Sequence, residues 1–330
     1  MKPKLTFFCE LEAQPLAALM TRPVLDRLGS LDAAVSLGLL DLSPERARVV
    51  RRLNRAGIPM IAWLLLPKDE GYWFNTGNYL AAARRYGAFC AWTEQYGLHW
   101  AGVGLDIETD IAEMRQLLVS PMRLAPVLAR RLLDTRQLDR AQAAYTALVE
   151  AIRADGYPVD SYTMPLLVDE RRAGSSLLRR LAGWVDLPVD REVLMLYSSF
   201  YRPYGHAILA SYAGDAPSAG LGVTGGGVEI EGMTPPPFLT WDEFQRDLLT
   251  AARFTRDLHV FSLEGCVQQG FLERLQTLDW EASPGAAPAS LEWVERARAL
   301  LRLKLTVASR PWALALAAAS LLVLWPRRRH

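Results

Sequence analysis

The sequence has little of several features that would reveal a function directly. It holds three cysteines, which are too few and too scattered for a disulfide framework, and we interpret them as buried thiols. No phosphate-binding loop and no paired-cysteine zinc spacing occurs, and the four histidines show no ligand-like pairing. The formal net charge of +1 lacks the basic surplus of a dedicated nucleic-acid-binding protein. We therefore expect no nucleic acid partner, no bound metal and no cofactor.

The amino terminus also lacks the pattern of a secretory signal. Lys2 and Lys4 are followed by only a short apolar run that contains acidic residues by position 12, so the segment is typical of a strand. The sequence is 51% hydrophobic and 22% charged, which is the composition of a large globular core. The absent signal favours a cytoplasmic location for this globular part.

The carboxyl terminus does contain a long uncharged segment. Residues 311–326 carry no charge and have a tryptophan near each end, and three arginines follow at 327–329. At ~1.5 Å per residue this run spans about 24 Å as a helix, slightly short of a ~30 Å hydrocarbon core, and residues 306–309 extend it. We predict a C-terminal hydrophobic helix that anchors the protein in a membrane at 305–330, and the alternative is a buried terminal helix. More basic residues precede the run than follow it, which favours a cytoplasmic barrel but leaves the side of the membrane open.

Short apolar runs alternate with helical segments along most of the chain, which is the pattern of a parallel α/β fold. Eight strands are predicted, at 5–9, 33–40, 59–66, 100–107, 159–164, 193–198, 220–224 and 258–263. Eight strands over this length predict a (β/α)8 TIM barrel. An open doubly wound sheet is the rival, and it is weaker because no glycine-rich fingerprint follows the first strand.

Three segments of different character divide the chain. The predicted barrel occupies 1–281, a linker with a basic amphipathic helix at 290–304 occupies 282–304, and the anchor occupies 305–330. Within the barrel we expect helices at 110–134, 138–154 and 175–182, among others. A helix beginning at Thr240 is marked by a capping box with Glu243, and Ser43 followed by Pro44 marks another start.

The strand ends matter most, because (β/α)8 barrels place their chemistry there. Asp106 and Glu108 end the fourth strand after a lean Gly-Val-Gly stretch, and residues two apart on a strand face the same way. Two carboxyls side by side in a cleft cannot both ionise freely, so one pKa rises and suits a general acid. The alternative is a helix-capping aspartate beside a solvated glutamate.

The run from Ala101 to Glu108, A-G-V-G-L-D-I-E, resembles the strand-four signature of chitinase-type glycoside hydrolases, D-G-x-D-x-D-x-E. The resemblance implies that Glu108 is the general acid and that Asp106 orients the substrate acetamide. A second match, M-L-Y at 195–197, resembles the family's M-x-Y-D and implies that Tyr197 contacts the acetamide. In that family the N-acetyl carbonyl of the substrate attacks the anomeric carbon, so no enzyme nucleophile is needed.

The sequence departs from this family pattern at several positions. Ala101 and Gly104 replace the first two acids, Ser198 replaces the aspartate after the strand-six tyrosine, and the strand-eight tryptophan is absent. These departures leave carbohydrate binding without turnover, or a different glycosidase mechanism, open.

Further polar and aromatic residues lie at or after the predicted strand ends. We interpret them as substrate-binding candidates: Glu10, Tyr72, Trp73, Asn75, Tyr162, Tyr201, Arg202 and Glu264. The aromatic residues offer flat faces to sugar rings, with a hydrophobic lid over the barrel as the equal alternative.

The sequence therefore predicts a membrane-anchored glycoside hydrolase that acts on a glycan, which carries N-acetyl groups if the resemblance holds. Two alternatives stay open. One is a non-catalytic barrel that binds a carbohydrate or a protein at the membrane. The other, weaker one is a metal-dependent phosphodiester hydrolase or lyase that uses an acidic ring of Glu10, Asp106, Glu108 and Glu264.

Overall fold

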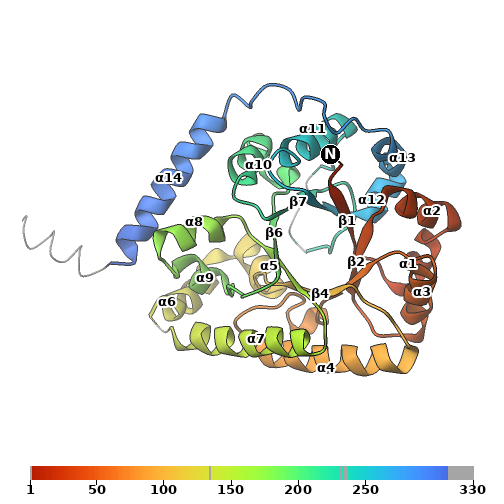
Figure 1. Ribbon diagram of the computed structural model, residues 1–330. Coiled ribbons are helices and arrows are strands. Elements are labelled where there is room, and N and C mark those ends of the chain that lie inside the picture. Colours follow the sequence, from red (N-terminus) through yellow and green to blue (C-terminus); the bar gives the residue numbers. More distant parts are fainter. Residues whose placement is uncertain (1, 134, 231, 233–236, 311–330) are drawn as a thin grey trace, which may run out of the picture.

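The structure is a computed structural model that describes residues 2–133, 135–230, 232 and 237–310. Eight parallel strands close into a barrel in the order β1 to β8, with helices around the outside (Figure 1). The (β/α)8 prediction is confirmed. The strands are β1 Lys4–Cys9, β2 Ala34–Leu39, β3 Met60–Leu64, β4 Gly102–Asp106, β5 Val159–Thr163, β6 Arg191–Met195, β7 Ser218–Gly222 and β8 Asp257–Phe261.

The connections between strands carry the helices and short 3₁₀ turns. The helices are α1 Ala13–Leu19, α2 Arg22–Leu31, α3 Pro44–Arg55, α4 Tyr79–Tyr96, α5 Ile111–Val119, α6 Ala125–Leu133, α7 Arg136–Ala154, α8 Leu166–Ala173, α9 Leu177–Ala182, α10 Gly205–Ala213, α11 Trp241–Ala251, α12 Leu263–Gln268, α13 Phe271–Gln276 and α14 Leu291–Ala308. The 3₁₀ turns are η1 Lys68–Glu70, η2 Pro121–Leu124 and η3 Ser198–Tyr201.

Side chains alternate between the two faces of each strand, as the period of two requires. On β4, Val103 and Leu105 belong to the large core between strands and helices. A second core fills the barrel interior and includes Phe8, Trp63 and Tyr162 in edge-to-face contacts with one another. Burying a large apolar side chain contributes roughly 1.5–3 kcal/mol, so both cores stabilise the barrel. The side chains of the second core fill the interior, which is therefore packed rather than hollow.

Local capping signals in the sequence are confirmed. The Ser43 hydroxyl accepts a hydrogen bond from the Arg46 backbone N–H at 3.1 Å, with Pro44 at the first position of α3. Thr240 and Glu243 form the predicted capping box at the start of α11. These signals act over three or four residues, which is why the sequence identifies them without tertiary information.

Three predicted elements differ in detail. Strand β7 covers 218–222 rather than 220–224. The predicted helix 110–134 is divided into α5, η2 and α6, because Pro121 disfavours helical backbone at Ser120, whose φ is −157°. The predicted helix 175–182 is α9, and α8 precedes it after Pro165.

Helix α14 is longer than the predicted 290–304 helix and packs against α8 and α10, along the outside of the barrel (Figure 1). Val294 and Leu305 are buried in this contact, and so is the basic residue Arg298. No helix within the described part of the chain combines the length and the apolar character that crossing a membrane requires. Of the predicted anchor at 305–330, residues 311–330 lie outside the described residues.

Candidate active site

The carboxyl end of β4 is extended by one bridge to the loop after β3. The Phe74 N–H donates to the Asp106 carbonyl at 2.9 Å, and the Glu108 N–H donates to the Phe74 carbonyl at 3.0 Å. This bridge keeps the backbone extended through Ile107, whose side chain joins the outer core. Asp106 and Glu108 flank Ile107 and therefore turn to the opposite side, toward the barrel axis.

Asp106 is held in the barrel interior and is 2% exposed. The indole N–H of Trp63 donates to its Oδ2 at 3.1 Å, while its buried Oδ1 has no hydrogen-bond donor among the described residues. Burial raises the pKa of Asp106 well above its ordinary value, the charges of Glu108 and Glu10 raise it further, and the bond from Trp63 opposes them.

Glu108 lies beside Asp106 but remains partly exposed. Burial raises the pKa of Glu108 to about 7, and its contact with Asp106 works in the opposite direction. The two carboxyls are close enough for the charge of Glu108 to raise the pKa of Asp106. A partly exposed carboxylic acid that keeps its proton near neutral pH has the properties of a general acid.

Glu10 follows β1 and faces the same region. The Tyr72 hydroxyl donates to Glu10 Oε1, across 62 positions of sequence. Tyr72 adopts left-handed backbone, with φ of 63°, which costs a non-glycine residue about 1–2 kcal/mol. Burial raises the pKa of Glu10 to about 8, the bond from Tyr72 opposes this shift, and the charges of Glu264 and Glu108 add to it.

Glu264 lies in the first turn of α12 and is 4% exposed. Its Oε1 accepts a hydrogen bond from the Glu10 backbone N–H at 3.4 Å, and burial raises the pKa of Glu264. The glycine-rich loop after β7 lies against it. A Cβ on Gly226, whose φ is 74°, would stand 2.3 Å from Glu264 Oε1, so only glycine allows this approach.

Gly104 stands where the chitinase-type signature has its inner aspartate. A Cβ on Gly104 would lie 2.2 Å from the Tyr162 hydroxyl oxygen, so the tyrosine occupies the space that a side chain here would need. The Tyr162 hydroxyl hydrogen-bonds the Ser36 hydroxyl at 2.6 Å, and Tyr162 is 1% exposed. The structure therefore places Tyr162, a predicted substrate contact, in the barrel interior.

Tyr197 and Tyr201 follow β6 and face the acidic pair. Tyr197 packs against Phe261 with ring centroids 5.8 Å apart, and after burial the nearby charges of Asp106 and Glu108 are the main causes that raise the pKa of Tyr197. Tyr201 is 39% exposed, and burial and then the charge of Glu108 raise the pKa of Tyr201. Both predicted residues thus lie near Glu108.

Other predicted residues make contacts elsewhere. Arg202 donates to Glu243 at 2.9 Å, on α11. The Asn75 amide is used within its own loop, where it donates to the Trp73 carbonyl and accepts from the Gly77 N–H. Trp73 is 7% exposed and packs edge-to-face against Tyr72, with ring centroids 5.2 Å apart. Both rings belong to the core that fills the barrel interior.

Two features of the site were missed from sequence. Trp63, the partner of Asp106, lies within the predicted apolar strand 59–66, and its alternation with Ala62 and Leu64 of the outer core places it on the inward face. Ser198, which replaces the family aspartate, donates to the carboxylate of Asp247 on α11. Among the described residues, no group of three or more histidine, cysteine, aspartate or glutamate side chains is arranged to hold a metal ion.

Comparison with solved structures finds the glycoside hydrolase domain of PgaB (BpsB) from Bordetella bronchiseptica, with a TM-score of 0.50 and 11% identity, covering 84% of this chain and 98% of that domain. The chain shares the (β/α)8 barrel fold of that domain. A GH18 chitinase from Pseudoalteromonas aurantia matches with a TM-score of 0.46 and 10% identity, covering 83% of this chain and 99% of that one. A GH18 chitinase from Chromobacterium violaceum matches with a TM-score of 0.45 and 12% identity, covering 84% of each chain.

No protein-family model and no curated protein matches the sequence. At these identities the structural likeness establishes the fold alone. The fold that the strand-four resemblance implied, a (β/α)8 barrel, is confirmed.

Proposed function

We propose that this protein cleaves a glycosidic bond, with Glu108 as the general acid and Asp106 as its partner. The observation that carries the proposal is the pair itself: a partly exposed Glu108 with a pKa raised to about 7, beside a buried Asp106 at the end of β4. Glu108 would protonate the leaving-group oxygen. Asp106, fixed by Trp63, would accept a hydrogen bond from the substrate, which is an acetamide N–H if the glycan is N-acetylated.

The departure at Gly104 does not remove support for Asp106. The family's inner aspartate supplies a partner to the residue aligned with Asp106, and here Trp63 supplies a hydrogen-bond donor to it from the neighbouring strand. Tyr197 lies close enough for the charges of both acids to act on it, which suits a substrate contact. The site therefore keeps an acid, an orienting carboxyl and a tyrosine with a changed supporting residue.

The decisive test replaces Glu108 with glutamine, which keeps the shape of the side chain but cannot donate its proton as an acid. Hydrolysis of an N-acetylglucosamine tetrasaccharide should fall by about 10²–10⁴-fold in kcat, with folding unchanged by circular dichroism. Glu94→Gln, an exposed acid on α4, is the matched control and should retain full activity. If Glu108→Gln cleaves a glycan at the normal rate, the assignment is wrong.

A non-catalytic binding barrel is the second candidate. Tyr162 fills the space of the signature aspartate, and the mouth is lined by packed aromatic side chains such as Trp73 and Tyr72. This candidate predicts that tetrasaccharide binding survives Glu108→Gln and that the wild-type protein gives no turnover. Binding calorimetry combined with product analysis by mass spectrometry separates the two functions.

We also propose that the uncharged run at 311–326, within the predicted anchor at 305–330, attaches the protein to a membrane, with the barrel on the cytoplasmic side. Support comes from the uncharged run at 311–326 and from the arginines and lysine that precede it. Truncation after residue 310 should release the protein from the membrane fraction while the barrel still folds. Retention of the truncated chain in that fraction would contradict the proposal.

A further inference from the structure

A groove with several arginines lies on the same face of the barrel as the acidic pair, outside the site described above. It encloses about 560 Å³, a volume in the range of roughly 300–1,000 Å³ that small-ligand sites occupy. We call it the arginine groove. Its lining comes from the loop after β3 and from α4, α6 and α7: Thr76, Gly77, Tyr79, Arg130, Arg136, Gln137 and Arg140.

The arginine groove continues toward the candidate acid. A second cavity of about 320 Å³ shares Gly77, Arg130 and Gln137 with it and is also lined by Asn75 and Asp110. Asp110 is two residues beyond Glu108, and Asn75 follows the loop segment that bridges β4. The second cavity therefore extends from the arginine groove to the loop that follows β4 and carries Glu108.

Carbonyl groups at the end of α9 bind two residues that line the cavities, Thr76 and Arg131, and the neighbouring Thr109. The Leu181 carbonyl accepts from Arg131 at 3.2 Å, the Ala182 carbonyl from Thr109 at 2.9 Å, and the Gly183 carbonyl from the Thr76 N–H at 2.9 Å. These bonds join α6, the β4 loop and the β3 loop to one short segment. The β3 loop at the groove is therefore held by a backbone hydrogen bond to Gly183.

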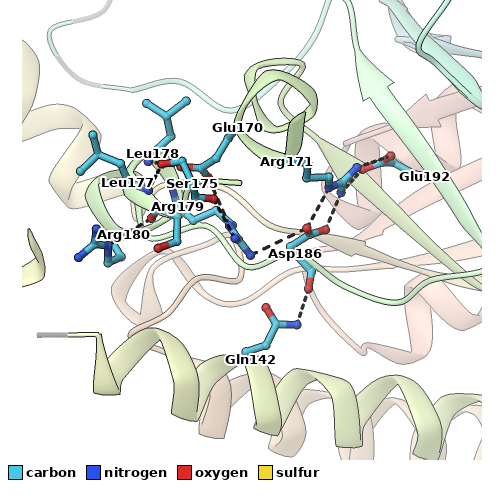
Figure 2. A network of polar contacts seen from close by, with 11 residues as sticks. Gln142, Glu170, Arg171, Ser175, Leu177, Leu178, Arg179, Arg180, Asp186 and Glu192 are labelled. Carbon is cyan, nitrogen blue, oxygen red and sulfur yellow. Dashed lines mark hydrogen bonds and ion pairs between the residues drawn. The ribbon is translucent and has the colours of Figure 1, made fainter. Parts of the chain in front are cut away.

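Figure 2 shows what holds α9 itself in place. The buried carboxylate of Glu170 accepts hydrogen bonds from the backbone N–H groups of Leu178 and Arg179 at the start of α9. Asp186, just after α9, accepts from Arg171 at 2.9 Å, and the Gln142 side chain of α7 donates to its carbonyl. This network ties α7, which contributes residues to the groove, to α8 and α9.

The charges that line the two cavities leave a positive excess in the arginine groove. Arg131 is paired with Glu113 at 2.7 Å, and the Asp110 carboxylate caps α5 by accepting from the Ala112 and Glu113 N–H groups. No hydrogen bond or ion pair joins Arg130 or Arg140 to another described residue. Two positive side chains therefore remain available in the groove.

Backbone groups add to this positive potential. Helices α4 and α7 both begin at the groove, and neither has a side-chain hydrogen bond from its N-cap residue, Asn78 or Thr135. The unpaired N–H groups of a helix start favour an anion. Asp139, in the first turn of α7, is the acidic side chain that opposes them, and it is exposed.

We propose that the arginine groove binds an acidic group of the substrate, so that this barrel acts on an anionic glycan bearing carboxylate, sulfate or phosphate. Guanidinium groups bind all three of these anions with paired hydrogen bonds. The inference rests on the proposed glycosidase function for its substrate class. It adds a specificity site that the chitinase-type resemblance does not supply.

The test uses calorimetry to measure how the full chain binds three tetrasaccharides. They are the neutral tetramer of N-acetylglucosamine, a sulfated form of that tetramer, and the tetramer of galacturonate. The double variant Arg130→Gln, Arg140→Gln should weaken binding of a charged tetrasaccharide by about tenfold and leave the neutral one unchanged. The control is the double variant Arg55→Gln, Arg253→Gln. It removes the same charge from two exposed residues, one at the end of α3 and one just after α11, and should not change binding.

Three results would overturn the inference. These are equal affinity for neutral and charged tetrasaccharides, an equal loss in the two double variants, or inorganic phosphate binding as tightly as the charged sugars. The last result would mean that the groove holds a free anion rather than a glycan. Glu108→Gln separates the two proposals, because it should lower kcat by about 10²–10⁴-fold and preserve charge-dependent binding. Charge-dependent binding without cleavage would reject only the glycosidase.

Discussion

The indole N–H of Trp63 on β3 donates to the buried carboxylate of Asp106 on β4 at 3.1 Å, so a core aromatic residue also supports the candidate active site. This bond stabilises the ionised form of Asp106, whose pKa burial raises. The balance between burial and this one donor decides how the proton is shared between Asp106 and Glu108. Several measurable consequences depend on that balance.

Removing the Trp63 donor should shift the pH dependence of activity. In Trp63→Phe the pKa of Asp106 rises further, because a hydrogen bond that lowers it is lost. The acidic limb of the kcat profile should therefore move to higher pH, and the variant should lose about 1–3 kcal/mol of stability because a buried acceptor is left without its donor. Trp293→Phe, at an exposed tryptophan, should leave the profile unchanged. An unmoved acidic limb in Trp63→Phe would argue against a role for Asp106.

The acidic site should make the protein less stable as pH rises. The folded pKa values of Glu108, about 7, and Glu10, about 8, exceed the ordinary 4.5, so the folded state binds more protons than the unfolded state between about pH 4.5 and 8. The contribution of these groups is fully present below pH 4.5 and is lost toward pH 8. Glu10→Gln should therefore flatten the decline in Tm across this window, by roughly a few degrees, whereas Glu94→Gln should not. A decline of the same steepness in Glu10→Gln would exclude Glu10 as its source.

Restoring a side chain at position 104 should disrupt the barrel interior. A Cβ there would stand 2.2 Å from the Tyr162 hydroxyl oxygen and 2.7 Å from the ring carbon that bears it. Gly104→Ala should cost about 1–3 kcal/mol in chemical denaturation, the range for overpacking a core. Combining it with Tyr162→Ala should make Gly104→Ala nearly neutral relative to Tyr162→Ala alone. Additive losses in the double variant would show that the two side chains do not compete for space.

Helix α14 should depend on a single buried arginine. Arg298 donates to Asp169 at 3.0 Å and to Asp215 at 2.8 Å, and its guanidinium lies 3.4 Å from the centre of the Tyr212 ring. Arg298→Met removes two of the hydrogen bonds to the buried Asp169 carboxylate and leaves it the Tyr212 hydroxyl and Arg302 at 3.4 Å. The change should cost about 3–5 kcal/mol of stability, or release α14 to proteolysis.

Arg296→Met is the control for this change. Arg296 pairs with Glu292 on the exposed side of α14, where both side chains are 81% exposed, so its loss should be hardly measurable. If the two methionine variants were equally stable, the packing of α14 against α8 and α10 would not depend on Arg298.

Short-range patterns allowed much of the fold to be predicted. Apolar runs located all eight strands, because a strand covered on both faces needs a continuous apolar segment. The least accurate strand was β7, Ser218–Gly222, whose small residues do not mark its ends; its extent is set by pairing with β6 and β8. The capping box at Thr240 and the helix break at Pro121 both depend only on neighbours in the chain. The capping box was predicted; the break was not, although the proline that causes it is visible in the sequence.

The sequence by itself determined that Asp106 and Glu108 share one side of a strand, because alternation along a strand is a local property. Only the tertiary structure decided what surrounds them: Trp63 from β3, Tyr72 against Glu10, and Tyr162 in the space beside Gly104. The arginine groove likewise comes from helices that meet only after the barrel closes. These contacts depend on strand register and closure, which bring distant residues together and which no local pattern of residues encodes.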